Sequence, residues 1–315
     1  MSDYAFVAER AKKAHASVAK LEALLLREPK NRAVQINLKG MQKRAQQASE
    51  ELEYLAAINR VEVCRYRVVP MTGRGYDLGS VSKVLLEYQN LFSQLYDSFR
   101  NGPKSKAVIG REARDKSALE FAYSYAGSLG VVLLTQSERD FFSGNLDEPI
   151  EAIYQIIEID DMDAVRDIAK VRGRAVVKRI YDWSNSLAEG GFAADIRWNR
   201  SDGKKLGEMV DRDRLEKIAG FIVEAADTKT DDLSVEGILV GANRDTGAFQ
   251  ISERGGETYK GHFDGEFIVP DEMTVGGLYK ATIRVADEYF YASDTHKKTN
   301  FLVRLDGPFL IENKV

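Results

Sequence analysis

Two matching sets of apolar residues near the N-terminus constrain the fold of this chain more than any other feature. Both follow the 3-4 spacing typical of a helix that packs against another helix. The first set is Tyr4, Val7, Ala11, Ala14, Val18, Leu21 and Leu25, and the second is Val34, Leu38, Met41, Ala45, Ala48, Leu52 and Leu55. If the chain folds back at residues 28–30, the sets pair antiparallel, with the two numbers of every pair adding to 59. The spacing therefore predicts an antiparallel coiled-coil hairpin over residues 1–60, with a seam about 32 Å long at 1.5 Å per residue.

The hairpin is expected to pack on the rest of the chain, on a second copy or on a partner protein. Alanines face alanines at its middle, so two backbones can approach closely there, and large residues fill both ends. We assign its seam as a candidate interface. The residues concerned are Val7, Ala11, Ala14, Val18, Leu21, Met41, Ala45 and Ala48. This interpretation predicts a homo-oligomer or a complex with a partner encoded in the same operon.

Charge separates the hairpin from the rest of the chain. The whole sequence has 45 basic and 49 acidic residues, a formal charge of −4. Residues 1–60 hold 11 basic and 7 acidic side chains, which is +4, so the remainder of the chain carries −8. The body is therefore a poor candidate for nucleic-acid binding, while the hairpin stays open to it. The candidate nucleic-acid-binding residues are Lys12, Lys13, Lys39, Lys43 and Arg44.

Composition points to a globular protein of the cytoplasm. Hydrophobic residues make up 44% of the chain, enough for a sizeable core, and Cys64 is the single cysteine, which fits a reducing compartment. The N-terminal segment MSDYAFVAERAKKAHASVAK does not have the apolar core of a signal peptide, and no apolar run is long enough to span a membrane. We therefore expect a cytoplasmic protein with no membrane insertion.

Residues 61–227 read as an α+β domain with a mostly antiparallel sheet. An alternating strand over residues 61–68 leads through a glycine-rich loop into a helix at about 79–100. A β-hairpin follows over residues 119–134, with a turn at Gly127-Ser128. Three helices are expected next, the first from Asp147, the second capped by Asp160 or Asp161, and the third from Arg174. A strand near 192–198 and a helix near 211–226 complete the domain.

From residue 228 onward the helical period disappears. Five short alternating runs separated by turn residues occupy residues 228–315, which predicts a small all-β domain resembling a barrel. This segment has 10 basic and 15 acidic residues, and its charge of −5 disfavours general binding to a phosphate backbone. The expected fold is thus α+β in three domains, with a helical hairpin, a central α+β domain and this small barrel.

One spacing in the hairpin suggests catalysis. Arg10 and His15 match the RxxxxH pattern, which resembles the catalytic motif of the all-helical ribonucleases called HEPN domains. The resemblance implies that the arginine and histidine of two copies meet across a dimer and cleave RNA without a metal ion. Against this interpretation, the residue after the arginine is the seam residue Ala11, and His15 is also what a solvated helix face would carry. The motif remains an alternative in which Arg10 and His15 are catalytic.

Two glycine-rich loops have simpler explanations than chemistry. The loop from Gly73 to Gly79 has the spacing GxGxxxG, which differs from a dinucleotide-binding fingerprint, and favours a turn before a helix. Residues 126–130, AGSLG, differ at one position from the GxSxG motif of a nucleophile elbow. An elbow needs a helix after the serine, however, and a strand is expected there. With three histidines and one cysteine, we predict no metal and no cofactor.

The middle and end of the chain resemble a widespread group of bacterial proteins. The segments concerned are FAYSYAGSLGVVLL, a helical stretch ending in WSNSLAEGG, and EGILVGANRDTGAFQIS followed by YKGHF, together spanning roughly residues 61–310. The resemblance implies accessory proteins of mobile or defence islands, without assigned chemistry. No catalytic residue follows from it, and the hairpin lies outside it.

The leading hypothesis from the sequence is a non-catalytic assembly or sensor protein of a bacterial multi-protein system, with anti-phage defence as one setting that fits. The hairpin and the C-terminal domain would supply its protein–protein contacts. The alternatives are a metal-independent ribonuclease using Arg10 and His15, and an accessory protein that binds nucleic acid through the basic hairpin.

Overall fold

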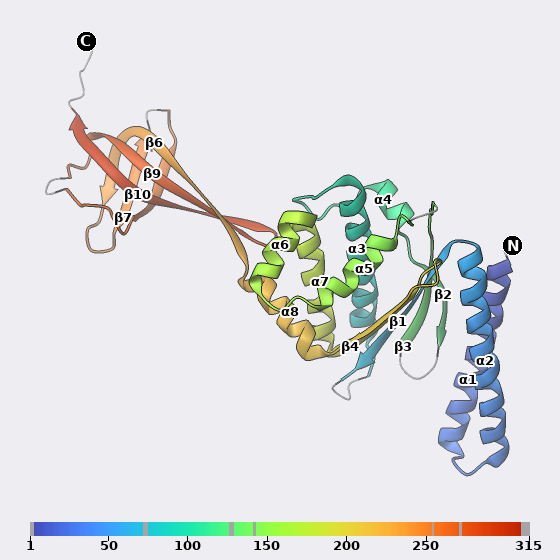
Figure 1. Cartoon of the computed structure of the whole chain (residues 1–315). Helices are drawn as coiled ribbons and strands as arrows, with labels where there is room; N and C mark the ends of the chain where they lie inside the picture. The colour runs from blue at the N-terminus through green and yellow to red at the C-terminus, as the bar shows by residue number, and fades with distance from the viewer. Residues whose placement is uncertain are drawn as a thin grey trace. The chain divides into compact units, whose positions relative to one another are not determined.

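The chain forms two compact units, Met1–Ala225 and Ala226–Val315, in a computed structural model (Figure 1). The structure describes residues 3–71, 75–125, 129–140, 143–253, 255–270 and 273–309. The hairpin and the residues up to 225 together make the first unit. The chain is a mixed α+β protein, as the sequence predicts.

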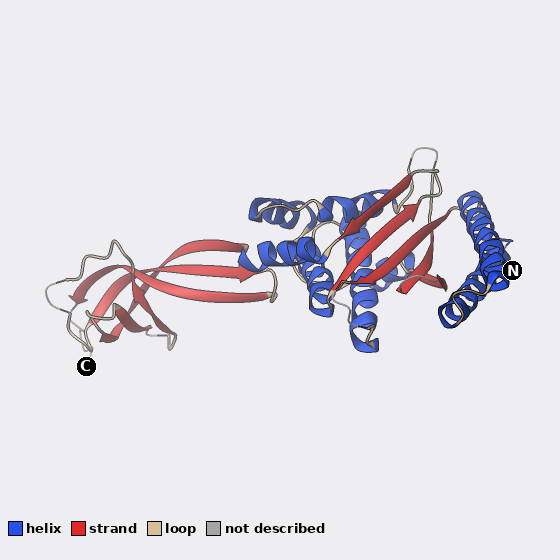
Figure 2. Cartoon of the chain, turned by 90° about the horizontal axis from the view of Figure 1, so that it is seen from below, coloured by secondary structure: helices blue, strands red, loops and turns tan. Residues whose placement is uncertain are grey.

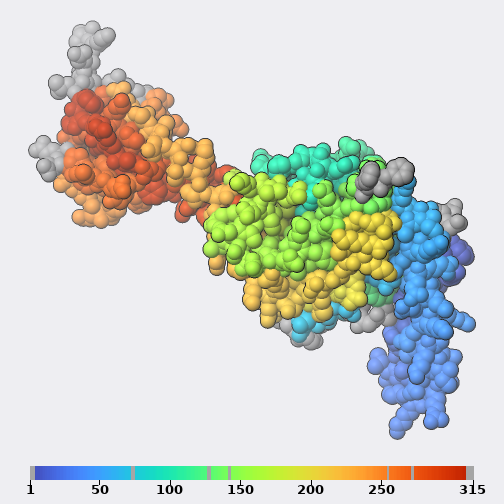
Figure 3. Space-filling view, viewed as in Figure 1, coloured from blue at the N-terminus to red at the C-terminus, as the bar shows by residue number. Residues whose placement is uncertain are grey.

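The first unit begins with the predicted pair of helices. Helix α1 covers Asp3–Arg27 and α2 covers Arg32–Ile58, and the side chain of Asn31 caps α2 by accepting a hydrogen bond from the backbone N–H of Val34 at 3.2 Å. Away from the rest of the unit, the two helices pack on each other alone, around Val18, Leu38 and Ala45. This distal half of the hairpin, in blue in Figure 3, projects beyond the body of the unit.

An open sheet of five strands forms the centre of the first unit. In chain order the strands are β1 (Val61–Pro70), β2 (Glu120–Tyr125), β3 (Leu129–Gln136), β4 (Phe192–Asn199) and β5 (Lys205–Val210). They lie in the order β2-β3-β1-β4-β5, and every neighbouring pair is antiparallel. Strand β1 is therefore central, with β3 on one side and β4 on the other.

Among the described residues of the first unit, six helices accompany the sheet. They are α3 (Leu78–Asn101), α4 (Arg111–Lys116), α5 (Asp147–Ile157), α6 (Met162–Arg172), α7 (Arg174–Gly190) and α8 (Arg212–Glu224). The carboxylates of Asp77, Asp161 and Asp211 each accept a hydrogen bond from the backbone N–H three residues further on, and so fix the starts of α3, α6 and α8. Figure 2 shows that these helices gather on one face of the sheet and that the hairpin stands against the other.

The face covered by the helices, called the inner face here, holds a core of hydrogen-bonded aromatic residues. The indole N–H of Trp183 donates to the Tyr66 hydroxyl and that of Trp198 to the Tyr88 hydroxyl, both at 3.0 Å. The Tyr66 and Tyr88 rings stack with centroids 4.3 Å apart. Cys64 is fully buried beside them, and burial raises the pKa of its thiol to about 12, so it is held as a neutral core residue.

The opposite face, the outer face, is covered by the hairpin along only part of its length. Val61 and Val63 of β1, Tyr123 of β2, and Val132 and Leu134 of β3 form one buried cluster with the hairpin. The hairpin residues of that cluster are Val7, Ala8, Ala11, Ala48, Leu52 and Ala56. Small residues beside the seam thus let α1 and α2 approach the sheet closely.

The second unit contains five strands at the positions of the five predicted runs. They are β6 (Ala226–Ala242), β7 (Ala248–Glu253), β8 (Thr258–Phe263), β9 (Leu278–Phe290) and β10 (Thr295–Phe309). Their hydrogen bonding closes in the order β10-β8-β7-β6-β9 around a core that includes Leu239, Ile251 and Ile283. Strand β9 pairs with both β6 and β10 beyond this core, so part of the unit is an extended three-stranded ribbon.

Most predicted elements of the first unit lie where the sequence places them. The helix at about 79–100 is α3, and the three helices after residue 147 are α5, α6 and α7, with Asp161 as the cap of α6. Two short elements, α4 and β5, have no counterpart in the prediction. The Gly127-Ser128 turn and part of the loop from Gly73 lie outside the described residues, so the structure does not test them.

Candidate functional site

A charged groove lies between α2 and the uncovered part of the outer face. It has a wide part of about 610 Å³ and an adjoining inner pocket of about 210 Å³. The wide part is lined by Gln46, Glu50, Glu53, Arg65, Asp195, Arg197, Asn199, Lys205, Leu206, Gly207, Glu208 and Met209. The inner pocket is lined by His15, Ser49, Arg65, Arg67, Tyr123, Tyr125, Val132, Asp195 and Arg197. We call the two together the hairpin–sheet groove.

The alternation of β1 places two arginines in this groove. Successive side chains of a strand point to opposite faces, so Val61, Val63, Arg65 and Arg67 share the outer face. The hairpin covers the two valines. The arginines come next along the same strand, where the hairpin no longer covers the sheet, and they line the inner pocket. One strand therefore supplies both the apolar contact with the hairpin and the charged wall of the groove.

Strand β4 adds a third arginine directly across from the first. The register pairs Arg65 with Arg197, and Arg67 with Asp195. Two like charges directly opposite on neighbouring strands are destabilising unless other groups neutralise them. The groove therefore needs carboxylates close to these guanidinium groups.

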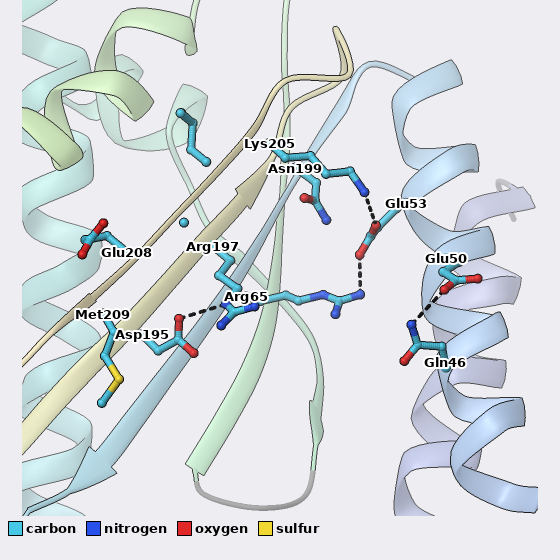
Figure 4. A pocket seen from close by; sticks show the side chains of 12 residues that line it. Gln46, Glu50, Glu53, Arg65, Asp195, Arg197, Asn199, Lys205, Glu208 and Met209 are labelled. Atoms are coloured by element: carbon cyan, nitrogen blue, oxygen red, sulfur yellow. Dashed lines mark hydrogen bonds and ion pairs between the residues drawn. The ribbon is translucent and has the colours of Figure 1, made fainter.

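Two carboxylates perform this neutralisation. Glu53 on α2 accepts a hydrogen bond from Nη2 of Arg65, as Figure 4 shows, and its other oxygen lies 3.5 Å from Nζ of Lys205. Asp195, whose side chain is nearly buried, accepts from Nη2 of Arg67 at 2.6 Å and from Nε of Arg197 at 3.0 Å. These pairs hold the guanidinium groups in place around the groove and tie the hairpin to the sheet.

His15 enters the inner pocket from α1. Its Nε2 lies 3.0 Å from Oγ of Ser49, which in turn lies 3.2 Å from the Tyr123 hydroxyl. The imidazole also stacks on the Tyr123 ring, with centroids 5.3 Å apart. Burial lowers the pKa of His15, and the positive charge of Arg65 lowers it further. The ring is therefore neutral at pH 7 and acts as an aromatic wall with a polar edge.

Tyr125 forms the wall of the inner pocket next to β3. Its ring lies over Gly130, its partner on β3, so closely that a Cβ at Gly130 would come within 2.4 Å of the ring carbons. Glycine is needed at this position for Tyr125 to lie flat on the neighbouring strand. Burial raises the pKa of the Tyr125 phenol, which keeps the hydroxyl protonated and able to donate a hydrogen bond.

Arg10 and His15, the two candidate catalytic residues, do not meet. Residues five apart on a helix point about 140° away from each other, given the helical pitch. Accordingly His15 lines the inner pocket, whereas Arg10 forms an ion pair with Glu51 of α2 and lines a different groove. Within one copy of the chain, the RxxxxH spacing does not assemble a shared site.

That different groove, of about 800 Å³, is called the outer groove. Its lining comes from the two hairpin helices and consists of Arg10, Ala14, Met41, Arg44, Gln47, Ala48, Glu50, Glu51 and Tyr54. The predicted nucleic-acid-binding residues Lys12, Lys13, Lys39, Lys43 and Arg44 are all exposed. Lys12 lies 3.4 Å from Glu9, and Arg44 is the one of the five that lines the outer groove among the described residues.

The predicted interface residues are mostly used within the chain itself. Val7, Ala11 and Ala48 are buried against the sheet, and Val18 and Ala45 are buried between the two helices. Three further seam residues, Ala14, Leu21 and Met41, are partly buried around that second cluster. A surface for a partner on the hairpin must therefore be formed by other side chains.

The sequence interpretation did not identify the arginines of the groove. It recognised strands at 61–68 and 192–198 but assigned no role to the charged residues on them. The available signal was a pair of charges two positions apart on each strand, Arg65 with Arg67 and Asp195 with Arg197, since such pairs point to the same face. Their joining into one site depends on the register between β1 and β4.

The described part of the chain contains no group of three or more histidine, cysteine, aspartate or glutamate side chains placed to hold a metal ion. Among the same residues, no helix combines the length and apolar character needed to cross a membrane.

Comparison with known proteins gives no match: no family model matches the chain, and it matches no curated protein and no solved structure.

Proposed function

We propose that this protein is a non-catalytic assembly or sensor protein of a bacterial multi-protein system, and that its helical hairpin associates with a second copy of the chain. The C-terminal unit would supply a further protein contact. The observation that supports the proposal most directly is a set of large apolar side chains exposed on the hairpin.

These side chains lie on the side of the hairpin that holds the outer groove. Phe6, Ile36, Tyr54 and Ile58 are between 61% and 71% exposed. Ile36 and Tyr54 are separated by five full helical turns, and Ile58 lies about one turn beyond Tyr54, so the three share one face of α2. Phe6 lies about one turn before Arg10 of the outer groove on α1. Ile36 lies about 27 Å from Tyr54 along α2, at 1.5 Å per residue, so the contact would run along the hairpin. Exposed apolar side chains along such a face suit a protein interaction site.

Charge favours a particular arrangement of the two copies. The hairpin carries +4 and residues 61–315 carry −8. Two hairpins placed face to face would repel each other, whereas a hairpin against the body of the second copy brings opposite charges together. We therefore propose hairpin-to-body contact between copies, and we expect it to weaken as salt screens the charges.

The test is the mass of the purified protein by light scattering. A stable multiple of the 35.3 kDa chain is expected for the wild type, and the double variant Ile36→Glu/Tyr54→Glu should have the mass of one chain. Leu26→Glu is the matched control: Leu26 is 84% exposed on the same hairpin but lies about 160° around α1 from Phe6. Deletion of residues 1–59 is a poorer test, because it would uncover Val61 and Val63 of the core.

Two results would overturn the proposal. A wild-type mass of one chain at all concentrations and at low salt would exclude self-association. An equal loss of mass in Leu26→Glu and in the double variant would show that the face bearing Ile36 and Tyr54 has no special part in it.

A further inference from the structure

The lining of the inner pocket itself has more positive than negative side chains. Three guanidinium groups line it, those of Arg65, Arg67 and Arg197, and Asp195 is the one carboxylate among its described lining residues. Because the pKa of His15 is lowered, its imidazole adds no charge at pH 7, and the lining carries +2. Glu53 reaches Arg65 from the wide part and reduces this excess to +1.

The carboxylates do not use all the N–H groups of the arginines. Each guanidinium has three nitrogens and five N–H groups. Arg65 and Arg67 each bind a carboxylate through Nη2. The Nε atom of each is buried and has no hydrogen-bond partner in the part of the chain that the structure describes. These Nε atoms are closed to the pocket, but the Arg65 and Arg67 side chains as a whole are 33% and 35% exposed, so other N–H groups at their guanidinium ends are open to an acceptor bound there.

Aromatic rings form the other wall of the same pocket. Tyr123 and His15 are stacked with an interplanar angle of 20°, and the Tyr125 ring lies 6.1 Å from that of His15. The hydrogen bond between His15 and Ser49 and the close packing of Tyr125 on Gly130 hold these rings in fixed positions. Aromatic side chains arranged in this way offer their faces or edges to a planar ring.

We propose that the inner pocket binds a small anion that contains a planar aromatic ring, with a phosphate or a carboxylate attached to the ring directly or through a sugar. The guanidinium groups suit the anionic end, because their paired N–H groups match the geometry of phosphate and carboxylate oxygens. The partly exposed rings of His15 and Tyr125 suit the planar end, and the fully buried Tyr123 holds the His15 ring in place by stacking on it. The volume of 210 Å³ equals about seven waters at ~30 Å³ each, which is room for one ring and its anionic group. A larger ligand would extend into the wide part.

This inference does not depend on the proposed self-association. The inner pocket is formed by α1, α2 and strands β1 to β4 of one chain, whereas the proposed contact uses Ile36 and Tyr54. A ligand in the pocket would touch both the hairpin, at His15 and Ser49, and the sheet. It would therefore stabilise the docking of the hairpin on the sheet.

The test is titration calorimetry on the full chain with four probes. Adenosine monophosphate combines a ring with a phosphate, and benzoate combines a ring with a carboxylate. Adenosine is a neutral ring, and inorganic phosphate is an anion without a ring. We expect adenosine monophosphate, benzoate or both to bind more tightly than phosphate, and adenosine to give no heat. Binding should weaken at least threefold between 50 and 500 mM salt. Which of the two ring anions binds shows whether the anionic group that the pocket accepts is a phosphate or a carboxylate.

Variants locate the binding. Arg67→Gln should weaken it at least tenfold. Arg67→Lys keeps the charge but loses the paired donors, so it should also weaken binding while leaving the ion pair with Asp195 possible. Arg27→Gln, in the exposed last turn of α1 and outside the lining of the inner pocket, is the matched control and should bind as the wild type does. Intrinsic fluorescence of Trp183 and Trp198 checks that each variant folds, since both indoles are buried in the first unit.

The outcomes that overturn the inference are distinct. Neither adenosine monophosphate nor benzoate binding at 1 mM would exclude a planar anion site. Adenosine binding as tightly as its monophosphate would remove the role of the arginines. An equal loss in Arg27→Gln and Arg67→Gln would place the binding outside the inner pocket. A wild type that binds a probe but has the mass of one chain would sustain this inference and reject the proposed self-association.

Discussion

The inner and outer faces of the central sheet have opposite chemistry, although the same strands make both. On β1, Tyr66 points into a dry core where Trp183 donates to its hydroxyl, while the next residue, Arg67, points into a groove open to solvent. On the inner face, each buried polar atom needs a hydrogen-bond partner from the chain, which restricts the side chains that can stand there. The outer face has charged side chains that line an open groove. One strand thus contributes to a buried core on one face of the sheet and to an open, charged groove on the other.

The same contrast runs along the outer face itself. Val61 and Val63 are covered by the hairpin, and Arg65 and Arg67 lie beyond that cover. Helix α2 passes from apolar contact with the sheet, at Leu52, to charged contact, at Glu53. The groove is therefore the place where the packing of the hairpin ends, and its shape depends on how the hairpin is docked.

The largest expected effect is on the inner face. Phe92 on α3 is fully buried and stacks on Trp198, with centroids 5.1 Å apart. Phe92→Ala should lower the free energy of unfolding by about 3–5 kcal/mol, because it removes buried area and leaves a cavity. Urea unfolding followed by tryptophan fluorescence measures this for the first unit, which holds both tryptophans.

The matched change on the outer face is Arg197→Ala. The Arg197 side chain is 63% exposed and faces a like charge, Arg65, across the strands, so its loss should change the same free energy by less than about 1 kcal/mol. If Arg197→Ala and Phe92→Ala lower the free energy of unfolding by similar amounts, the inner face does not contribute more to stability than the outer face.

A smaller effect separates two tyrosines. Tyr66→Phe removes the acceptor of the Trp183 indole N–H in a fully buried place and should cost about 1–3 kcal/mol. Tyr125→Phe removes a hydroxyl from the partly exposed pocket wall, where water can replace it, and should stay within about 0.5 kcal/mol. The comparison uses the same urea experiment, and it fails if the two substitutions cost the same.

The elements that sequence predicted well are those with a local signal. The 3-4 spacing over residues 1–60 specified the hairpin, and Asp161 before an amphipathic stretch specified the start of α6. Strand β5 was missed because its sequence, KLGEMV, is short, contains a glycine and does not alternate between polar and apolar residues, and Val210 is its one buried residue. Helix α4, REARDK, has one buried residue, Ala113, and so shows no apolar period.

The candidate site could not be predicted from the sequence for a different reason. Arg65 and Arg197 become neighbours through a register between strands that are far apart in sequence. The docking of the hairpin on the sheet depends on Ala8, Ser49 and Ala56, which lie outside the heptad positions and look like ordinary helix residues. Long-range register and a second packing face carry no local pattern, so the groove that they create could not be predicted.

The smallest expected effect is on pH dependence, and it involves the one histidine of the groove. Unfolded, the His15 imidazole titrates near 6.5; in the folded chain burial and Arg65 lower this pKa. The other titratable or charged groups around the inner pocket come from α2, β1, β2 and β4, and are Glu53, Arg67, Tyr123, Tyr125, Asp195 and Arg197. Between the lowered pKa and 6.5 the unfolded chain binds more protons than the folded chain, so stability falls as pH drops through that window.

His15→Gln removes this contribution while an amide can still reach Ser49. The loss of unfolding free energy between pH 7.5 and pH 5 should therefore be smaller in His15→Gln than in the wild type, as measured by urea unfolding at the two pH values with tryptophan fluorescence. His262→Gln changes a histidine of β8 in the second unit and should keep the wild-type difference. If His15→Gln also keeps that difference, the imidazole is not held neutral by the pocket, and the net charge counted for the inner pocket rises as the pH approaches 6.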